Sequence, residues 1–180
     1  MTPTTKTKWV IDPMHSEIHF KAKHLVISTV TGRFDRFEAT AVTNGDDFTN
    51  AAVEFSAEVN SINTGQPDRD NHLKSADFFD AANFPRLTFK STGLKKKSSS
   101  RLTMTGELTI RGNTKNIDLD ADFGGIVTDA YGFTRAGFEM TGRVNRKEFG
   151  LHWNAITEAG SIVVADEVRL QLNIEMIKQS

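Results

Sequence analysis

Apolar and polar residues alternate with a period of two along most of the chain, and this pattern constrains the fold more than any other feature. Such alternation is typical of β-strands that turn one face to a core and the other to solvent. The segment 168–176 is a clear case, with an apolar residue at every even position. Further segments of this kind are 17–26, 53–59, 87–91, 102–110, 117–123 and 133–145. Together with 32–42, they predict an all-β protein of about eight strands.

The strand pattern is interrupted at two informative places. In 32–42, Phe34 lies on one parity and Phe37 on the other, which predicts a β-bulge near Asp35-Arg36. Arg111-Gly112-Asn113 separates two strongly alternating segments and predicts a tight hairpin connection.

One segment, 68–80, has a helical pattern, with Asp68 as its expected N-cap and a proline at 85 beyond its end. The chain shows no linker or repeat. We therefore expect residues 1–8 to form a disordered or extended tail and residues 9–180 to form a single barrel domain.

The predicted inner faces combine small and large apolar residues. Small residues lie in mid-strand, at Ala22, Ala57, Gly106, Ala121, Ala136 and Gly142. Large residues flank them, at Phe20, Phe55, Met104, Phe123, Phe138 and Met140. A barrel of about eight strands is either filled by side chains or holds one small ligand. Two interpretations stay open: an elongated void with apolar walls, or a packed core in which small residues face large ones.

Motifs for common chemistries are absent from the sequence. There is no cysteine, which removes disulfides, thiol catalysis and thiolate metal sites. There is also no nucleophile elbow, dinucleotide-binding glycine motif or P-loop. The net charge is −1, and no basic run interleaves with aromatic residues. We therefore expect no enzymatic activity, no cofactor and no nucleic-acid partner.

The five histidines do not form a metal-binding pattern. His15 and His19 share a parity but would lie roughly 13 Å apart in a strand, and His24 faces the other side. We therefore expect no metal site. The aspartates at 118, 120 and 122 predict a solvated outer face rather than a paired-carboxylate site.

The densest polar cluster, Asp68 to His72, begins the predicted helix. Arg69 and His72 are candidates to meet an anionic head group at a pocket mouth, near a helix N-terminus. The alternative is that they only cap and solvate the helix.

The N-terminal residues 1–8 are polar, and no apolar signal segment follows them. The longest aliphatic run, 162–165, is far too short to span a bilayer. The expected location is cytoplasmic, or periplasmic if a leader segment has been removed.

Several segments, taken in order, resemble the YceI-like (polyisoprenoid-binding) family. The most specific is Asp68-Arg69-Asp70-Asn71-His72-Leu73-Lys74-Ser75-Ala76-Asp77-Phe78-Phe79, followed by Phe84-Pro85. The others are 9–12, 15–20, 31–34, 106–112, 145–150 and 164–168. The resemblance covers residues 9–177.

The resemblance implies a lipocalin-like eight-stranded antiparallel barrel with a short helical insertion. It also implies an interior pocket for an isoprenoid, quinone-like molecule or fatty amide, and a homodimer. Transient membrane contact is expected for a different reason, since a lipid gains little free energy on moving from a bilayer into an apolar pocket. Inner-face parity and the implied pocket together predict these ligand contacts: Phe20, Ala22, Phe34, Phe55, Leu73, Phe78, Met104 and Phe138. Arg69 and His72 remain the head-group candidates.

Three functional hypotheses follow. The first is non-enzymatic binding of a long-chain lipid, for carriage, storage or stress-related sequestration. The second is an enzyme that acts on a bound lipid through His24 or His72 with a nearby aspartate. The third is a packed structural barrel without a ligand. An apolar lining selects an apolar guest, which favours the first.

Overall fold

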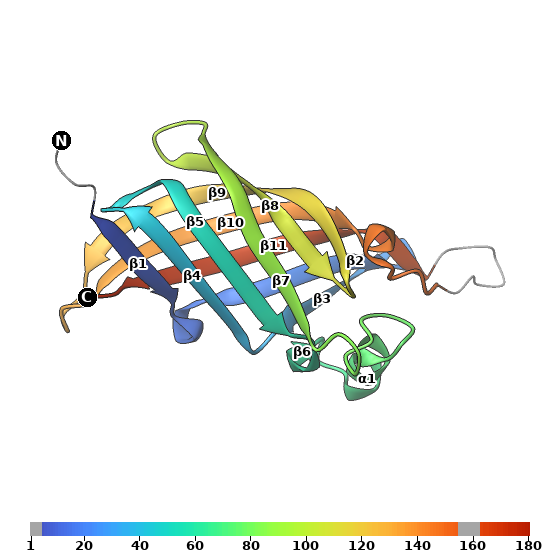
Figure 1. Ribbon diagram of the computed structural model, residues 1–180. Helices are drawn as coiled ribbons and strands as arrows, with labels where there is room; N and C mark the ends of the chain where they lie inside the picture. The colour runs from blue at the N-terminus through green and yellow to red at the C-terminus, as the bar shows by residue number, and fades with distance from the viewer. Residues whose placement is uncertain (1–4, 155–162) are drawn as a thin grey trace.

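The computed structural model describes residues 5–154 and 163–180, which contain eleven strands and one α-helix (Figure 1). The strands are β1 (Lys6–Ile11), β2 (Glu17–His24), β3 (Ser28–Phe34), β4 (Phe37–Asn44), β5 (Asp47–Glu58), β6 (Ile62–Asn63), β7 (Arg86–Lys96), β8 (Arg101–Ile110), β9 (Asn113–Thr128), β10 (Thr134–Asn145) and β11 (Val164–Lys178). The helix is α1 (Pro67–Lys74), and the 3-10 turns are η1 (Pro13–His15), η2 (Val59–Ser61) and η3 (Arg146–Phe149). Within these described residues, no helix has the length and apolar character needed to cross a bilayer.

Eight strand positions close the barrel. Strands β1, β4, β5, β7, β8, β9, β10 and β11 are neighbours in that order, and β11 pairs back with β1. The end of β11, Met176 to Lys178, pairs with β1, while its earlier part, Val164 to Asn173, pairs with β2. Strands β1 and β2 are therefore two halves of one strand kinked at η1, and β3 and β4 are two halves of another. The predicted eight-stranded antiparallel barrel with a short helical insertion is confirmed.

The break in parity between Phe34 and Phe37 is a bend between two strands, so the predicted β-bulge is wrong. Asp35 and Arg36 leave the ladder, and the N–H of Asp35 donates to the carbonyl of Ser61 in η2. The two residues turn β3 into β4. The inward parity is reset at this two-residue bend, which joins the two halves of the strand.

The helix expected at 68–80 is present but shorter, and its N-cap was predicted wrongly. Gln66, not Asp68, is the N-cap residue of α1, because a proline occupies the first helical position. Ser75 has extended backbone angles and ends the helix. The chain beyond it continues in hydrogen-bonded turns that lie against one end of the barrel (Figure 1).

The barrel also begins earlier than the expected boundary at residue 9, because Lys6 already pairs with Asn44.

The tight connection between β8 and β9 is confirmed, since Ile110 pairs directly with Asn113. Its two residues, Arg111-Gly112, have φ angles of 51° and 72°. Two consecutive positive φ angles are the geometry of a type I′ hairpin turn.

Two inner-face glycines make room for large neighbours. A Cβ atom at Gly106 would lie 2.3 Å from the Phe89 ring, and one at Gly142 would lie 2.6 Å from Leu119. An aromatic ring that covers a glycine on the adjacent strand is a recognised packing device of β-sheets. At these positions the packed-core interpretation is correct, and the glycines do not contribute to a void.

Replacing Gly106→Ala tests this packing. The new methyl group would meet the Phe89 ring and, at 2.6 Å, the rigid carbonyl oxygen of Lys90. We expect a loss of about 1–3 kcal/mol in the free energy of unfolding, as for other overpacked positions, measured by urea denaturation. Gly93→Ala is the matched control, because nothing lies within 4 Å of its Cβ position. Equal losses in the two variants would contradict the packing argument.

Candidate functional site: an apolar barrel interior

The larger interior cavity has a volume of about 160 Å³ and lies near α1. Its walls come from β2, β3, β7, β8, β10, β11, η3, and α1 with the turns that follow it, and the surface they present to the cavity is entirely apolar. Five of the residues predicted to contact a ligand line it: Phe20, Ala22, Phe34, Leu73 and Phe78. An apolar cavity of about this size stays dry and admits a small hydrocarbon.

A smaller cavity of about 80 Å³ lies farther along the barrel, and its exposed wall is also entirely apolar. The other three predicted contact residues line it: Phe55, Met104 and Phe138. Leu172 lines both cavities. The barrel therefore contains an apolar interior in two adjoining parts, which combines the two interpretations left open by the sequence.

Strand β11 shows how alternation builds this interior. Its even-numbered side chains point inward, as period-two geometry requires. Val168 and Leu170 line the larger cavity, Ile174 and Met176 line the smaller one, and Leu172 lies between them. One strand therefore runs along both cavities and sets their order along the barrel.

The predicted head-group residues do not line either cavity. Arg69 donates from Nε to Thr64 Oγ1 at 2.7 Å and from Nη2 to the Thr64 carbonyl at 2.8 Å. His72 lies 2.9 Å from Asp77 and packs edge-on against Trp153 and Phe78. Arg69 therefore ties the helix to the loop before it, and His72 packs behind Phe78, which is itself a wall residue.

A different arginine, missed by sequence reasoning, lines the larger cavity. Arg146 is 5% exposed, and its guanidinium donates to the main-chain carbonyls of Leu151, Trp153, Val164 and Ala165. Burial lowers the pKa of this guanidinium, and Asp166, at 3.7 Å, opposes the shift only in part. Because the surface exposed to the cavity is apolar, the guanidinium nitrogens lie behind the wall. We interpret Arg146 as a clamp that holds the loop after η3 against β11.

The histidines proposed for chemistry on a bound lipid also lie outside the cavities. His24 pairs with Val164 in the β2–β11 ladder, and neither it nor His72 is a wall residue. Asp118 and Asp120 accept hydrogen bonds from threonines on the outer face, as expected for a solvated exterior. The position of these residues gives the enzymatic hypothesis no support.

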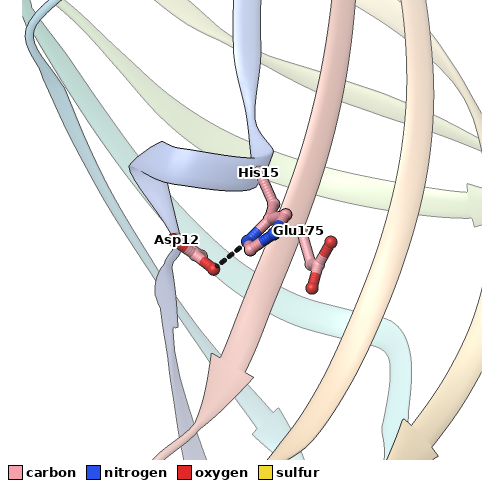
Figure 2. A group of neighbouring side chains, drawn as sticks. All are labelled: Asp12, His15 and Glu175. Carbon is pink, nitrogen blue, oxygen red and sulfur yellow. Dashed lines mark hydrogen bonds and ion pairs between the residues drawn. The ribbon is translucent and has the colours of Figure 1, made fainter. Parts of the chain in front are cut away.

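A charged cluster lies at the kink between β1 and β2. Asp12, His15 and Glu175 converge there with their possible ligand atoms within 4.8 Å of one another (Figure 2). Arg135 Nη1, however, lies 2.8 Å from Asp12 and 2.9 Å from Glu175, and its Nε lies 2.8 Å from Asp129. The guanidinium therefore binds all three carboxylates and offsets part of their negative charge, and a metal ion would have to displace it. We interpret the group as a structural ion-pair cluster.

Within this cluster, the electrostatics favour the charged forms of Asp12 and Arg135. Burial alone would raise the pKa of the Asp12 carboxyl, but hydrogen bonds from His15, Arg135 and the Met14 N–H outweigh it and hold that pKa below its usual value. The same carboxylates raise the pKa of Arg135. The cluster joins η1 to β10 and β11, where the barrel closes.

Comparisons with known proteins agree with this architecture. The family model of the YceI-like domain matches residues 9–176. A UPF0312 protein of Staphylococcus aureus (strain USA300) is 34% identical over 170 residues, 94% of this chain and 96% of that protein. The crystal structure of a Campylobacter jejuni YCEI protein, 32% identical, has a TM-score of 0.74 and covers 88% of this chain and 90% of that one.

A more distant solved structure shares the fold. It is a polyisoprenoid binding domain from Saccharophagus degradans that is implicated in plant cell wall breakdown. It is 14% identical, has a TM-score of 0.70, and the match covers 95% of this chain and 98% of that one.

Neutralising Asp12 by Asp12→Asn tests the ion-pair cluster. A depressed native pKa gives stability that is present above the unfolded-state pKa and is lost as the pH falls through the native pKa. At pH 7 we expect the variant to lose about 1.5–3 kcal/mol, the range for hydrogen bonds to charged groups. The difference should shrink as the pH falls below about 4, measured by urea denaturation across pH.

Glu167→Gln is the matched control for this prediction. Glu167 lies 3.6 Å from Arg143 in an exposed pair, for which a change of only about 0.5 kcal/mol is expected. A loss in Asp12→Asn that is the same at pH 3 and pH 7 would contradict the electrostatic explanation.

Proposed function

The chain belongs to the YceI-like domain family, and on that premise we propose that its barrel interior binds the hydrocarbon chain of an isoprenoid or other long-chain lipid without changing it chemically. The observation that carries this proposal is the pair of apolar cavities that meet at Leu172. A polyisoprenoid binding domain of the same fold supports it. Carriage, storage or sequestration of such a lipid would all use this binding.

The volume of the interior is too small for a whole long-chain lipid, so the walls must move when a lipid enters. The cavities of about 160 and 80 Å³ hold only part of a long chain, so further space must come from movement of wall side chains. Met104, Met140 and Met176 line the smaller cavity, and methionine adapts its shape at little cost. Each CH₂ group moved from water into such a site contributes about 0.8 kcal/mol.

The apolar wall also indicates which part of a lipid belongs inside. A polar head group buried there without a hydrogen-bond partner would be strongly disfavoured. The proposal therefore places hydrocarbon in the barrel and the head group outside it. The homodimer implied by the family resemblance stays a prediction, to be measured by light scattering in solution.

Narrowing the larger cavity by Ala22→Leu tests the binding proposal. The longer side chain should occupy space otherwise open to the lipid, so an organic-solvent extract of the purified variant should contain several-fold less long-chain lipid than wild type, by mass spectrometry. Glu107→Leu, which adds the same side chain at an exposed position next to the wall residue Leu108, is the control. A wild-type protein that stays empty after incubation with geranylgeraniol would overturn the proposal and favour the packed barrel.

Joining the two cavities by Leu172→Ala tests whether one chain runs through both. We expect the ratio of affinities for geranylgeraniol over geraniol to rise roughly tenfold, the effect of about two more buried CH₂ groups. Leu170→Ala is the control, because Leu170 lines only the larger cavity. Both variants should lose about 2–5 kcal/mol of stability. An unchanged ratio in Leu172→Ala would restrict the ligand to one cavity.

A further inference from the structure

The turn between β2 and β3 presents apolar side chains to solvent. Val26 and Ile27 are 74% and 85% exposed. Leu25 and Val26 have φ angles of +53° and +64°, in the left-handed region that glycine and asparagine adopt far more readily. A branched apolar residue is a poor choice for this turn on grounds of folding alone. Backbone strain of this kind is a reason to look for a function.

This turn lies beside one end of the larger cavity. His24, the last residue of β2, pairs with Val164 on β11, and the N–H of Leu25 donates to the carbonyl of Val163 at 2.9 Å. Ala22 and Val164 are both wall residues of the larger cavity. The exposed apolar turn therefore begins directly after the rung at which that cavity ends.

A row of cations crosses the outer face of the same part of the barrel. Lys21 on β2 is paired with Arg169 on β11, and Arg169 is paired with Arg143 on β10. Like charges directly opposite one another destabilise a sheet. Within residues 5–154 and 163–180, only Arg143 of these three has a carboxylate at ion-pair distance, Glu167 at 3.6 Å. We call these three residues the basic row.

The basic row continues toward the turn through Lys23, which is exposed and lies on the same face of β2 as Lys21. Acidic side chains also lie on this outer face: Glu167 on β11, Glu148 in η3, and Asp118 and Asp120 on β9, which is on the far side of β10 from the turn. Among the described residues, Lys21, Lys23 and Arg169 nevertheless have no carboxylate at ion-pair distance, so unpaired positive charge lies close to the turn although the whole chain has a net charge of −1.

We propose that the Leu25–Ile27 turn and the basic row together dock this end of the barrel on an anionic lipid bilayer. Lys23 and Lys21 precede the turn by roughly 7 and 13 Å of strand. Apolar groups at a membrane surface enter the boundary between head groups and acyl chains by about 5–10 Å. The turn would therefore reach that boundary while the cations meet lipid phosphates. The inference rests on the proposed function for its purpose, since a bilayer is the source of a hydrocarbon cargo.

Sedimentation with vesicles tests this docking surface. Wild-type protein should bind vesicles of phosphatidylcholine and phosphatidylglycerol more strongly than phosphatidylcholine alone, and more weakly as salt rises. The double variant Lys21→Gln, Arg169→Gln should lower the partition coefficient about 30-fold, which corresponds to about 1 kcal/mol for each basic residue removed. The double variant Val26→Asn, Ile27→Asn should lower it on both kinds of vesicle.

The matched control is Lys95→Gln, Lys96→Gln, which removes the same charge at the exposed end of β7 and should keep wild-type binding. Folding should survive in each variant: asparagine tolerates left-handed backbone, and loss of Arg169 removes a like-charge pair, so urea midpoints should stay equal or rise. No binding by wild type, or equal losses in the control, would overturn the inference. The inference would also be overturned if the asparagine variant bound vesicles as strongly as wild type and heparin abolished that binding. This result would indicate a general site for polyanions.

Lipid content, measured on the same samples, separates this inference from the proposed function. Bound lipid with no vesicle binding would leave the interior site standing and remove the docking surface. Vesicle binding by a protein that takes up no lipid would do the reverse.

Discussion

The barrel is closed by β11, and the kinks in its strands and the position of its charged cluster follow from this closure. An open edge would leave a row of unpaired N–H and C=O groups, and a closed sheet removes it. Because β11 pairs with β2 along one part and with β1 at its end, the first strand of the barrel must be kinked between them. The kink is η1, where Asp12 accepts a hydrogen bond from the N–H of Met14 and ion pairs with Arg135 on β10. The charged cluster therefore stabilises the place where the barrel closes.

The interior stays apolar although Arg146 lines it, because the donors of this residue are satisfied outside the cavity. Its guanidinium is buried, yet its N–H groups donate to main-chain carbonyls. A buried charge with hydrogen-bond partners costs much less than an unpaired one. What remains exposed to the two cavities is hydrocarbon alone, and this limits a guest to the hydrocarbon part of a molecule.

The two faces of the same strands carry different proposed roles. On β2, Phe20 and Ala22 line the larger cavity, while Lys21 and Lys23 lie on the opposite parity and form part of a basic surface. Strand geometry makes this division automatic, since successive side chains point to opposite sides. A site for hydrocarbon and a surface for lipid phosphates can therefore share the same strands, with the apolar turn between β2 and β3 next to both.

The sequence by itself determined which side chains point inward. Phe20, Phe55 and Phe138 could be assigned to the interior because side-chain direction alternates along a strand whatever its neighbours are. The tight turn at Arg111-Gly112 was predictable for a similar reason, since its chemistry is local.

Which residues from distant segments meet depends on the tertiary structure. Phe89 packs over Gly106, and Lys21 lies opposite Arg169, because the register between neighbouring strands brings them together. Arg146 is buried while Arg69 bonds outside the cavity, and this too depends on how segments distant in sequence are placed. The strand register is set when the barrel closes, because a shift of one residue would turn each inner face outward.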